Sequence, residues 1–122
     1  MSIDLTISSN YKKEYTHVTI KGVLDLYTSA EFVRTIYDEE TTQQKTMILD
    51  FKEVQFVDTH GIGTLIQSYK TLAEKGISIK LLSPSSSIKK AFELSGFSKL
   101  GIPMYDSIDM AFTIKAKKGE SL

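Results

Sequence analysis

The chain has 122 residues, and its 15 lysine and arginine residues balance its 15 aspartate and glutamate residues. This length excludes two independent cores of ordinary size, and zero net charge argues against nucleic-acid binding, which usually draws on a basic excess. The absence of cysteine excludes disulfides and thiolate chemistry, and no apolar run approaches the roughly 20 residues of a membrane helix. We therefore expect one cytoplasmic domain that binds neither nucleic acid nor a membrane.

Two strands are predicted at the start of the chain. Ile3, Leu5 and Ile7 alternate with polar residues, which predicts a half-buried strand, and residues 15–24 predict a second. The segment 10–14 between them is short and polar enough to be a turn, so we expect an antiparallel pair.

A helix is expected after the second strand. Thr28 and Glu31 have the spacing of a capping box, in which the threonine accepts from a helical amide and the glutamate reaches back. Phe32 and Ile36 then form an apolar stripe, and the polar segment 38–45 ends the helix.

The middle of the chain predicts a central strand and the most regular helix. Residues 47–51 resemble a strand that is buried on both faces, as in the centre of a covered sheet. Apolar residues recur at helical spacing from Ile62 to Ala73, and Gly76 is the expected end of this helix.

The last third of the chain continues the alternation of strands and helices. We expect a strand over 77–82, a helix from Ser85 to Gly96, a short strand near 102–105 and a last helix from about Asp106. Such strand-helix-strand units imply parallel pairing through right-handed crossovers. The predicted fold class is α/β, with a mixed central sheet of four to five strands and about four helices.

The segment from Phe56 to Gly63 is unusual because an acid, a hydroxyl and an imidazole precede the most regular helix. Helix N-termini present unpaired amides and the positive end of a dipole. The plainest interpretation is that Asp58 or Thr59 is the N-cap, with nearby glycines allowing tight packing. A second interpretation makes Thr59 a reversible phosphoacceptor, because a phosphate adds about −1.5 to −2 charge and can favour or repel a partner.

Other chemistries fit this segment poorly. A dinucleotide fingerprint needs glycine where Ile66 stands, and a hydrolase elbow needs glycine where Val57 stands. Three consecutive side chains point apart and cannot form a triad, and a metal site would have only His17 as a second imidazole. We therefore expect no catalytic residue, no metal and no cofactor.

Several motifs resemble the STAS domain family, specifically its bacterial anti-sigma-factor antagonists. Residues 58–63, DTHGIG, resemble the family signature D-S-[ST]-G-[LIVM]-[GA]. The others are GVLD at 22–25, LDFKEV at 49–54, SP at 83–84 and FELSGF at 92–97, which resemble G-x-[IL]-D, L-D-[LF]-x-x-V, S-P and F-E-L-T-G-[LF]. Because they follow family order along nearly the whole chain, we expect a STAS domain over 1–114 and a tail over 115–122.

The resemblance implies partner switching. In this family, the unphosphorylated antagonist binds an anti-sigma factor that is also a serine/threonine kinase, and so releases a sigma factor. The kinase phosphorylates the hydroxyl residue after the signature aspartate, and a metal-dependent phosphatase removes the phosphate. The corresponding acceptor is Thr59, where the family usually has serine, and His60 replaces a second small hydroxyl residue.

The partner-binding residues implied by the resemblance surround this acceptor, and we add two at the exposed start of the first helix. The full set is Asp25, Tyr27, Thr28, Asp58, Thr59, His60, Gly61 and Ile62. Asp25 can also be interpreted as a solvated acid or a turn residue, and His60 as an exposed loop side chain. An alternative function is a STAS subunit of another assembly, such as a stressosome-like scaffold or a lipid-transporter accessory protein.

Overall fold

Five strands form one mixed sheet in the computed structural model, which describes residues 5–38 and 43–112. The strands are β1 (Leu5–Tyr11), β2 (Thr16–Leu24), β3 (Thr46–Val57), β4 (Ser78–Leu82) and β5 (Met104–Tyr105), and they lie side by side in that order. β1 pairs antiparallel with β2, and the three remaining neighbouring pairs, β2–β3, β3–β4 and β4–β5, are parallel. The predicted α/β fold with a mixed sheet is confirmed.

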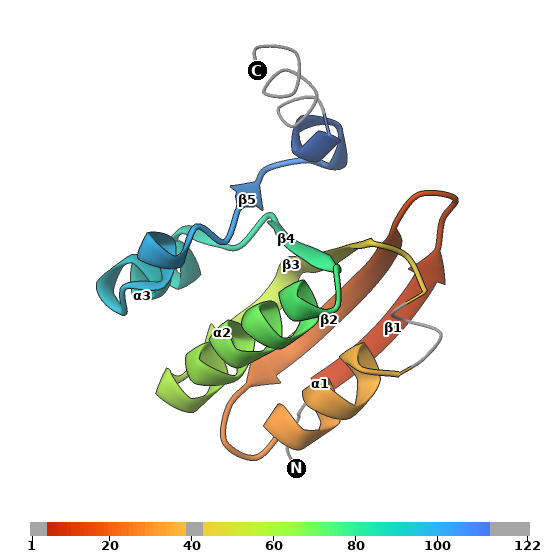
Figure 1. Ribbon diagram of the computed structural model, residues 1–122. Helices are drawn as coiled ribbons and strands as arrows, with labels where there is room; N and C mark the ends of the chain where they lie inside the picture. Colours follow the sequence, from red (N-terminus) through yellow and green to blue (C-terminus); the bar gives the residue numbers. More distant parts are fainter. Residues whose placement is uncertain (1–4, 39–42, 113–122) are drawn as a thin grey trace.

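Three helices connect the strands: α1 (Ser29–Ile36), α2 (Thr59–Glu74) and α3 (Ser86–Leu94). α1 and α2 lie next to each other across one face of the sheet (Figure 1). The ring of Phe51 in β3 meets the ring of Phe92 in α3 edge to face, with centroids 6.2 Å apart, so α3 packs on the same face. A short 3-10 turn, η1 (Phe97–Leu100), leads from α3 toward β5.

The opposite face of the sheet contacts the end of the described chain. Residues 108–112 are helical, and the Phe112 ring lies 5.2 Å from the Tyr15 ring, centroid to centroid. The buried Lys80 of β4 donates to the carbonyl of Ala111 at 3.0 Å, and its ammonium lies 4.5 Å from the centre of the Phe112 ring. The expected last helix is thus present up to residue 112, and its continuation lies outside the described residues.

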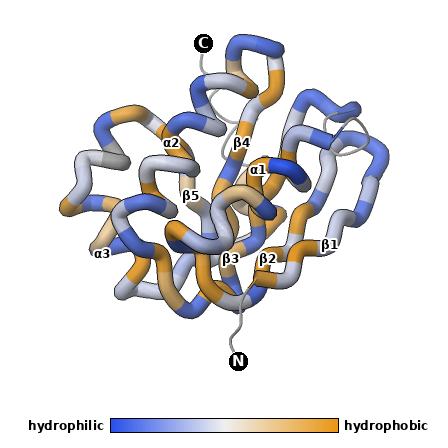
Figure 2. Tube along the Cα trace, turned by 90° about the horizontal axis from the view of Figure 1, so that it is seen from below, coloured by the Kyte–Doolittle hydropathy of each residue, from blue (hydrophilic) through white to orange (hydrophobic). Residues whose placement is uncertain are grey.

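The hydrophobic core lies between the sheet and the three helices. Phe32, Phe51 and Phe92 are among its largest fully buried side chains, and burying each contributes about 1.5–3 kcal/mol. In Figure 2 the hydrophobic colour recurs along the strands, β1 and β2 included, whereas the turn that joins β1 to β2 is hydrophilic. The polar segment between two half-apolar strands could therefore be predicted as a turn from the sequence.

The predicted capping box of α1 is wrong. The Thr28 hydroxyl accepts from the amide of Asp25 at 3.0 Å and donates to the carbonyl of Val23 at 2.8 Å, and it makes no cap hydrogen bond. Glu31 pairs with Arg34 one turn further on instead of reaching back. The backbone of Thr28 is already helical, whereas a side-chain N-cap usually needs an extended residue.

β3 is longer than predicted, and its register with β2 shifts twice. Thr19 lies opposite Asp50 and Leu24 lies opposite Val57, so 24 − 19 = 5 steps along β2 match 57 − 50 = 7 steps along β3. The buried residues at the end of β3 are consequently three apart, at Phe51, Val54 and Val57. The two extra residues bring the ends of β2 and β3 level with each other.

Candidate functional site

The candidate site lies where β2 and β3 end at the same edge of the sheet. Asp25 directly follows β2, and Asp58 directly follows β3. The amide of Asp58 donates to the carbonyl of Leu24 at 3.2 Å, which ties the two loops together. The proximity that the motifs implied for Asp25 and the 58–63 segment is therefore present.

Asp58 is the N-cap of α2. Its backbone is extended, and its Oδ1 accepts from the amide of Gly61 at 2.8 Å. Such a cap contributes about 1 kcal/mol to helix stability. This geometry confirms the plainest interpretation of the segment and makes Thr59 the first helical residue.

The side chain of Thr59 is exposed, and its hydroxyl makes no hydrogen bond with any described residue. The next residue, His60, is exposed as well, and its carbonyl accepts from the Thr64 hydroxyl at 3.0 Å. An exposed, uncommitted hydroxyl on a capped helix is accessible to an enzyme that modifies it.

Gly61 sets how closely α2 approaches the sheet. A Cβ atom there would lie 2.3 Å from the carbonyl oxygen of Leu24 and 3.0 Å from Cγ1 of Val57. Gly63, in contrast, has open space where its Cβ would be. The expected packing role of the glycines is therefore confirmed for Gly61 and wrong for Gly63.

Asp25 shapes the turn that leads into α1. Its Oδ1 accepts from the amides of Tyr27 at 2.9 Å and Thr28 at 3.1 Å, as a turn aspartate does. Tyr27 is held on this turn with 87% of its surface exposed. The carboxylate of Asp25 thus fixes the backbone of the turn that carries the exposed Tyr27.

Thr59 lies between two grooves. One, of about 600 Å³, runs between α1 and α2 and is lined by Val33, Tyr37 and the side of α2 from Thr59 to Thr71. The other, of about 570 Å³, lies between α2 and α3 and is lined by Phe56 and Leu94 among others. Thr59 borders both, so a group added to its hydroxyl changes both surfaces.

Phe56 and Leu94 were not predicted as site residues, although they are 54% and 80% exposed beside Thr59. Leu94 lies off the apolar stripe that the sequence assigns to its helix, and a residue off such a stripe is expected to be exposed. The signal was therefore present for Leu94. Phe56 follows the irregular part of β3, where no simple period predicts which side chains are buried.

The predicted partner-binding residues divide into two groups. The exposed or half-buried members are Asp25, Tyr27, Thr28, Asp58, Thr59 and His60, and the buried members are Gly61 and Ile62. The buried pair fixes the position of α2, whereas the others form the surface. No lysine or arginine lines either groove in the described part of the chain.

Two features of residues 5–38 and 43–112 bear on other functions. No three histidine, aspartate or glutamate side chains there are grouped closely enough to hold a metal ion. No described helix has the length and apolar character needed to cross a membrane.

The chain is similar to known proteins in sequence and in structure. The STAS domain family model matches residues 6–111. The "Anti-sigma F factor antagonist" of Paenibacillus polymyxa is 28% identical over 113 residues, which are 91% of this chain and 95% of that protein. The "Anti-sigma-B factor antagonist" of Staphylococcus aureus is 22% identical over 98 residues, 80% of this chain and 91% of that protein. The crystal structure of an anti-sigma factor antagonist from Mycobacterium paratuberculosis has a TM-score of 0.78 at 20% identity, covering 91% of this chain and 93% of that one.

Proposed function

Because the chain belongs to the STAS domain family, we propose that it is an anti-sigma factor antagonist that is switched by phosphorylation of Thr59. Unphosphorylated, it binds an anti-sigma factor with serine/threonine kinase activity and so releases a sigma factor. The kinase phosphorylates Thr59 and ends the interaction, and a metal-dependent phosphatase restores it. The names of its relatives support this role, and the exposed hydroxyl of Thr59 between two grooves is the observation that carries it.

Exposed apolar side chains flank the proposed acceptor. Tyr27 lies on the turn after β2, and Phe56 and Leu94 line the groove between α2 and α3. Aromatic side chains are enriched in protein interfaces, and tyrosine is among the residues that contribute most to binding there. We propose that the anti-sigma factor covers these side chains together with Thr59.

A phosphate on Thr59 would oppose this contact by its charge. Asp25 and Asp58 already place two carboxylates at this edge, and among the described residues that line the grooves only His60 can carry positive charge. Burying a phosphate without a cationic partner is unfavourable. The start of α2 tolerates the modification in the free protein, because its dipole stabilises an anion by about 0.3–1 kcal/mol. The switch therefore needs no movement of the sheet.

Intact mass after incubation with the cognate kinase and ATP tests the acceptor. Wild type should gain one phosphate, whereas Thr59→Val, which keeps the shape and removes the hydroxyl, should gain none. Phosphorylated protein and Thr59→Glu should bind the anti-sigma factor at least about 100-fold more weakly than the unphosphorylated protein. No phosphate on wild type, or unchanged affinity after phosphorylation, would contradict the proposal.

The remaining features are proposed on the same basis. The domain extends over residues 1–114, followed by a tail over 115–122, and it acts in the cytoplasm as a binding protein without catalytic activity. The absence of activity can be checked by incubating the purified protein with ATP alone and measuring released phosphate, which should not exceed the buffer blank.

A further inference from the structure

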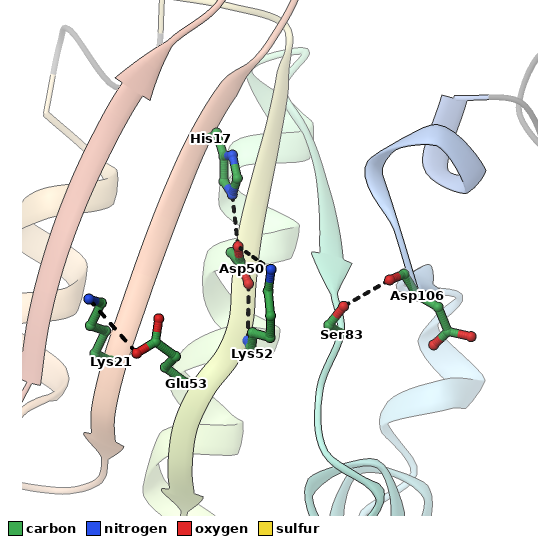
Figure 3. A network of polar contacts seen from close by, with 7 residues as sticks. All are labelled: His17, Lys21, Asp50, Lys52, Glu53, Ser83 and Asp106. Carbon is green, nitrogen blue, oxygen red and sulfur yellow. Dashed lines mark hydrogen bonds and ion pairs between the residues drawn. The ribbon is translucent and has the colours of Figure 1, made fainter.

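Asp50 is a nearly buried carboxylate away from the Thr59 loop, and it has three polar contacts. Its Oδ2 lies 2.9 Å from Nε2 of His17 in β2 and 4.0 Å from Nζ of Lys52. Its Oδ1 accepts from the backbone amide of Lys52 at 3.0 Å. Figure 3 shows Asp50 between the His17 ring and the Lys52 backbone. Only 7% of the Asp50 side chain is exposed.

The amide that donates to Asp50 is that of Lys52, which lies at the first register shift between β3 and β2. Thr19 lies opposite Asp50, and Lys21 lies opposite Glu53, so residues 51 and 52 together face the single residue Ile20. The extra residue in such a bulge is left without a partner in the ladder. The Asp50 carboxylate supplies an acceptor to the backbone at this point.

The bulge affects the position of the Thr59 loop. It adds one of the two extra residues that bring Val57 opposite Leu24. Without it, β3 would slip by one residue, and a one-residue slip turns every following side chain to the other face of a sheet. Val54 and Val57 would then leave the core, and Asp58 would not be level with Leu24.

A buried carboxylate is costly unless it is paired and hydrogen-bonded. Asp50 has the Lys52 ammonium 4.0 Å away, and it is hydrogen-bonded to the His17 ring and to the Lys52 amide. We infer that Asp50, held by His17, is a positioning residue that fixes the first bulge of β3 and thereby the place of Thr59 beside Asp25. The functional consequence rests on the proposed function, whereas the structural consequence does not.

Three variants test this inference: Asp50→Ala, Asp50→Asn and Glu53→Gln. Asp50→Ala removes the acceptor, and Asp50→Asn keeps an oxygen that can accept from the Lys52 amide. Glu53→Gln is the matched control, because Glu53 lies beside the bulge but is exposed and pairs only with Lys21 at 3.8 Å. Amide hydrogen exchange and amide chemical shifts are measured by NMR in all three, and Thr59 phosphorylation rates follow.

In Asp50→Ala we expect exchange of the Lys52 amide to accelerate at least about tenfold. Shift changes should extend to residues 58–61, whereas a loss of global stability alone would leave the chemical shifts of the folded protein unchanged. The phosphorylation rate should fall about tenfold while unfolding still begins well above the assay temperature. Asp50→Asn should restore most of the protection of the Lys52 amide and most of the phosphorylation rate. Glu53→Gln should resemble wild type.

The inference is overturned if folded Asp50→Ala keeps wild-type shifts at 58–61, or if Asp50→Asn loses Lys52 protection as fully as alanine would. If Asp50→Ala does not fold, Asp50→Asn decides: retained Lys52 protection supports the inference, and its loss overturns it. The NMR results need no kinase, so a wild-type protein that is never phosphorylated would refute the proposed function and leave this test intact.

Discussion

The close approach of α2 to the sheet gives a sharp prediction for two neighbouring glycines. In Gly61→Ala, the new Cβ would lie 2.3 Å from the carbonyl oxygen of Leu24. Because such contacts do not fall below 3.0 Å, the start of α2 must retreat by at least 3.0 − 2.3 = 0.7 Å. Overpacking of this kind costs about 1–3 kcal/mol, and the atom it meets is backbone, which has little freedom to move.

Gly63→Ala is the matched control, because a Cβ there meets nothing within 4 Å. It removes a glycine from the interior of α2 and should stabilise the protein by about 0.5–1 kcal/mol. For a chain of this size, 1 kcal/mol shifts the melting temperature by about 4 °C. We therefore expect Gly61→Ala to melt about 4–12 °C below wild type and Gly63→Ala about 2–4 °C above it.

Circular dichroism during heating and urea titration measures both changes, and the difference between the two variants is the quantity of interest. It cancels much of the uncertainty in helix propensity, since both variants make the same substitution in one helix. If Gly61→Ala were as stable as Gly63→Ala, the contact between α2 and the end of β2 would be wrong. The placement of Thr59 beside Asp25 would then lose its basis.

Three further predictions concern other contacts. Ser68→Ala should leave the unfolding free energy unchanged or raise it by about 1 kcal/mol in urea titrations, because the Ser68 hydroxyl is buried without a hydrogen-bond partner in the described structure; a clear loss would reveal an unrecognised bond. Asp25→Ala should lower the free energy of unfolding by about 1–2 kcal/mol in urea titrations, because its turn hydrogen bonds are lost. Asp25→Asn should keep most of the wild-type stability; an equal loss in both variants would show that the negative charge matters more than the hydrogen bonds. Leu94→Ser should change stability by less than about 0.5 kcal/mol but weaken anti-sigma factor binding about tenfold by calorimetry, and unchanged affinity would remove the α2–α3 groove from the interface.

Regular elements could be predicted because their periods are simple. The apolar positions from Ile62 to Ala73 follow helical spacing, and α2 covers them all. The end of β3 could not be predicted in this way, because its buried residues are three apart, which matches neither a strand nor a helix. That spacing results from pairing with β2, and pairing partners are not visible in a local window.

The site divides in the same way between local and distant causes. The cap at Asp58 depends on four consecutive residues, so a local motif was enough to indicate it. The capping box at Thr28 failed because the hydroxyl is used by the turn from Asp25. The pair of His17 and Asp50 joins residues 33 positions apart, and only the parallel pairing of β2 with β3 brings them together.

The first two turns of α2 contain residues under two kinds of sequence constraint. Gly61, Ile62 and Leu65 are buried and hold the helix on the sheet, whereas Thr59, His60 and Gly63 are exposed. After gene duplication, a copy of this domain can therefore change the exposed positions while the buried ones preserve folding. Under the proposed function, several such domains in one cell would distinguish their partners through these few exposed side chains at the start of α2.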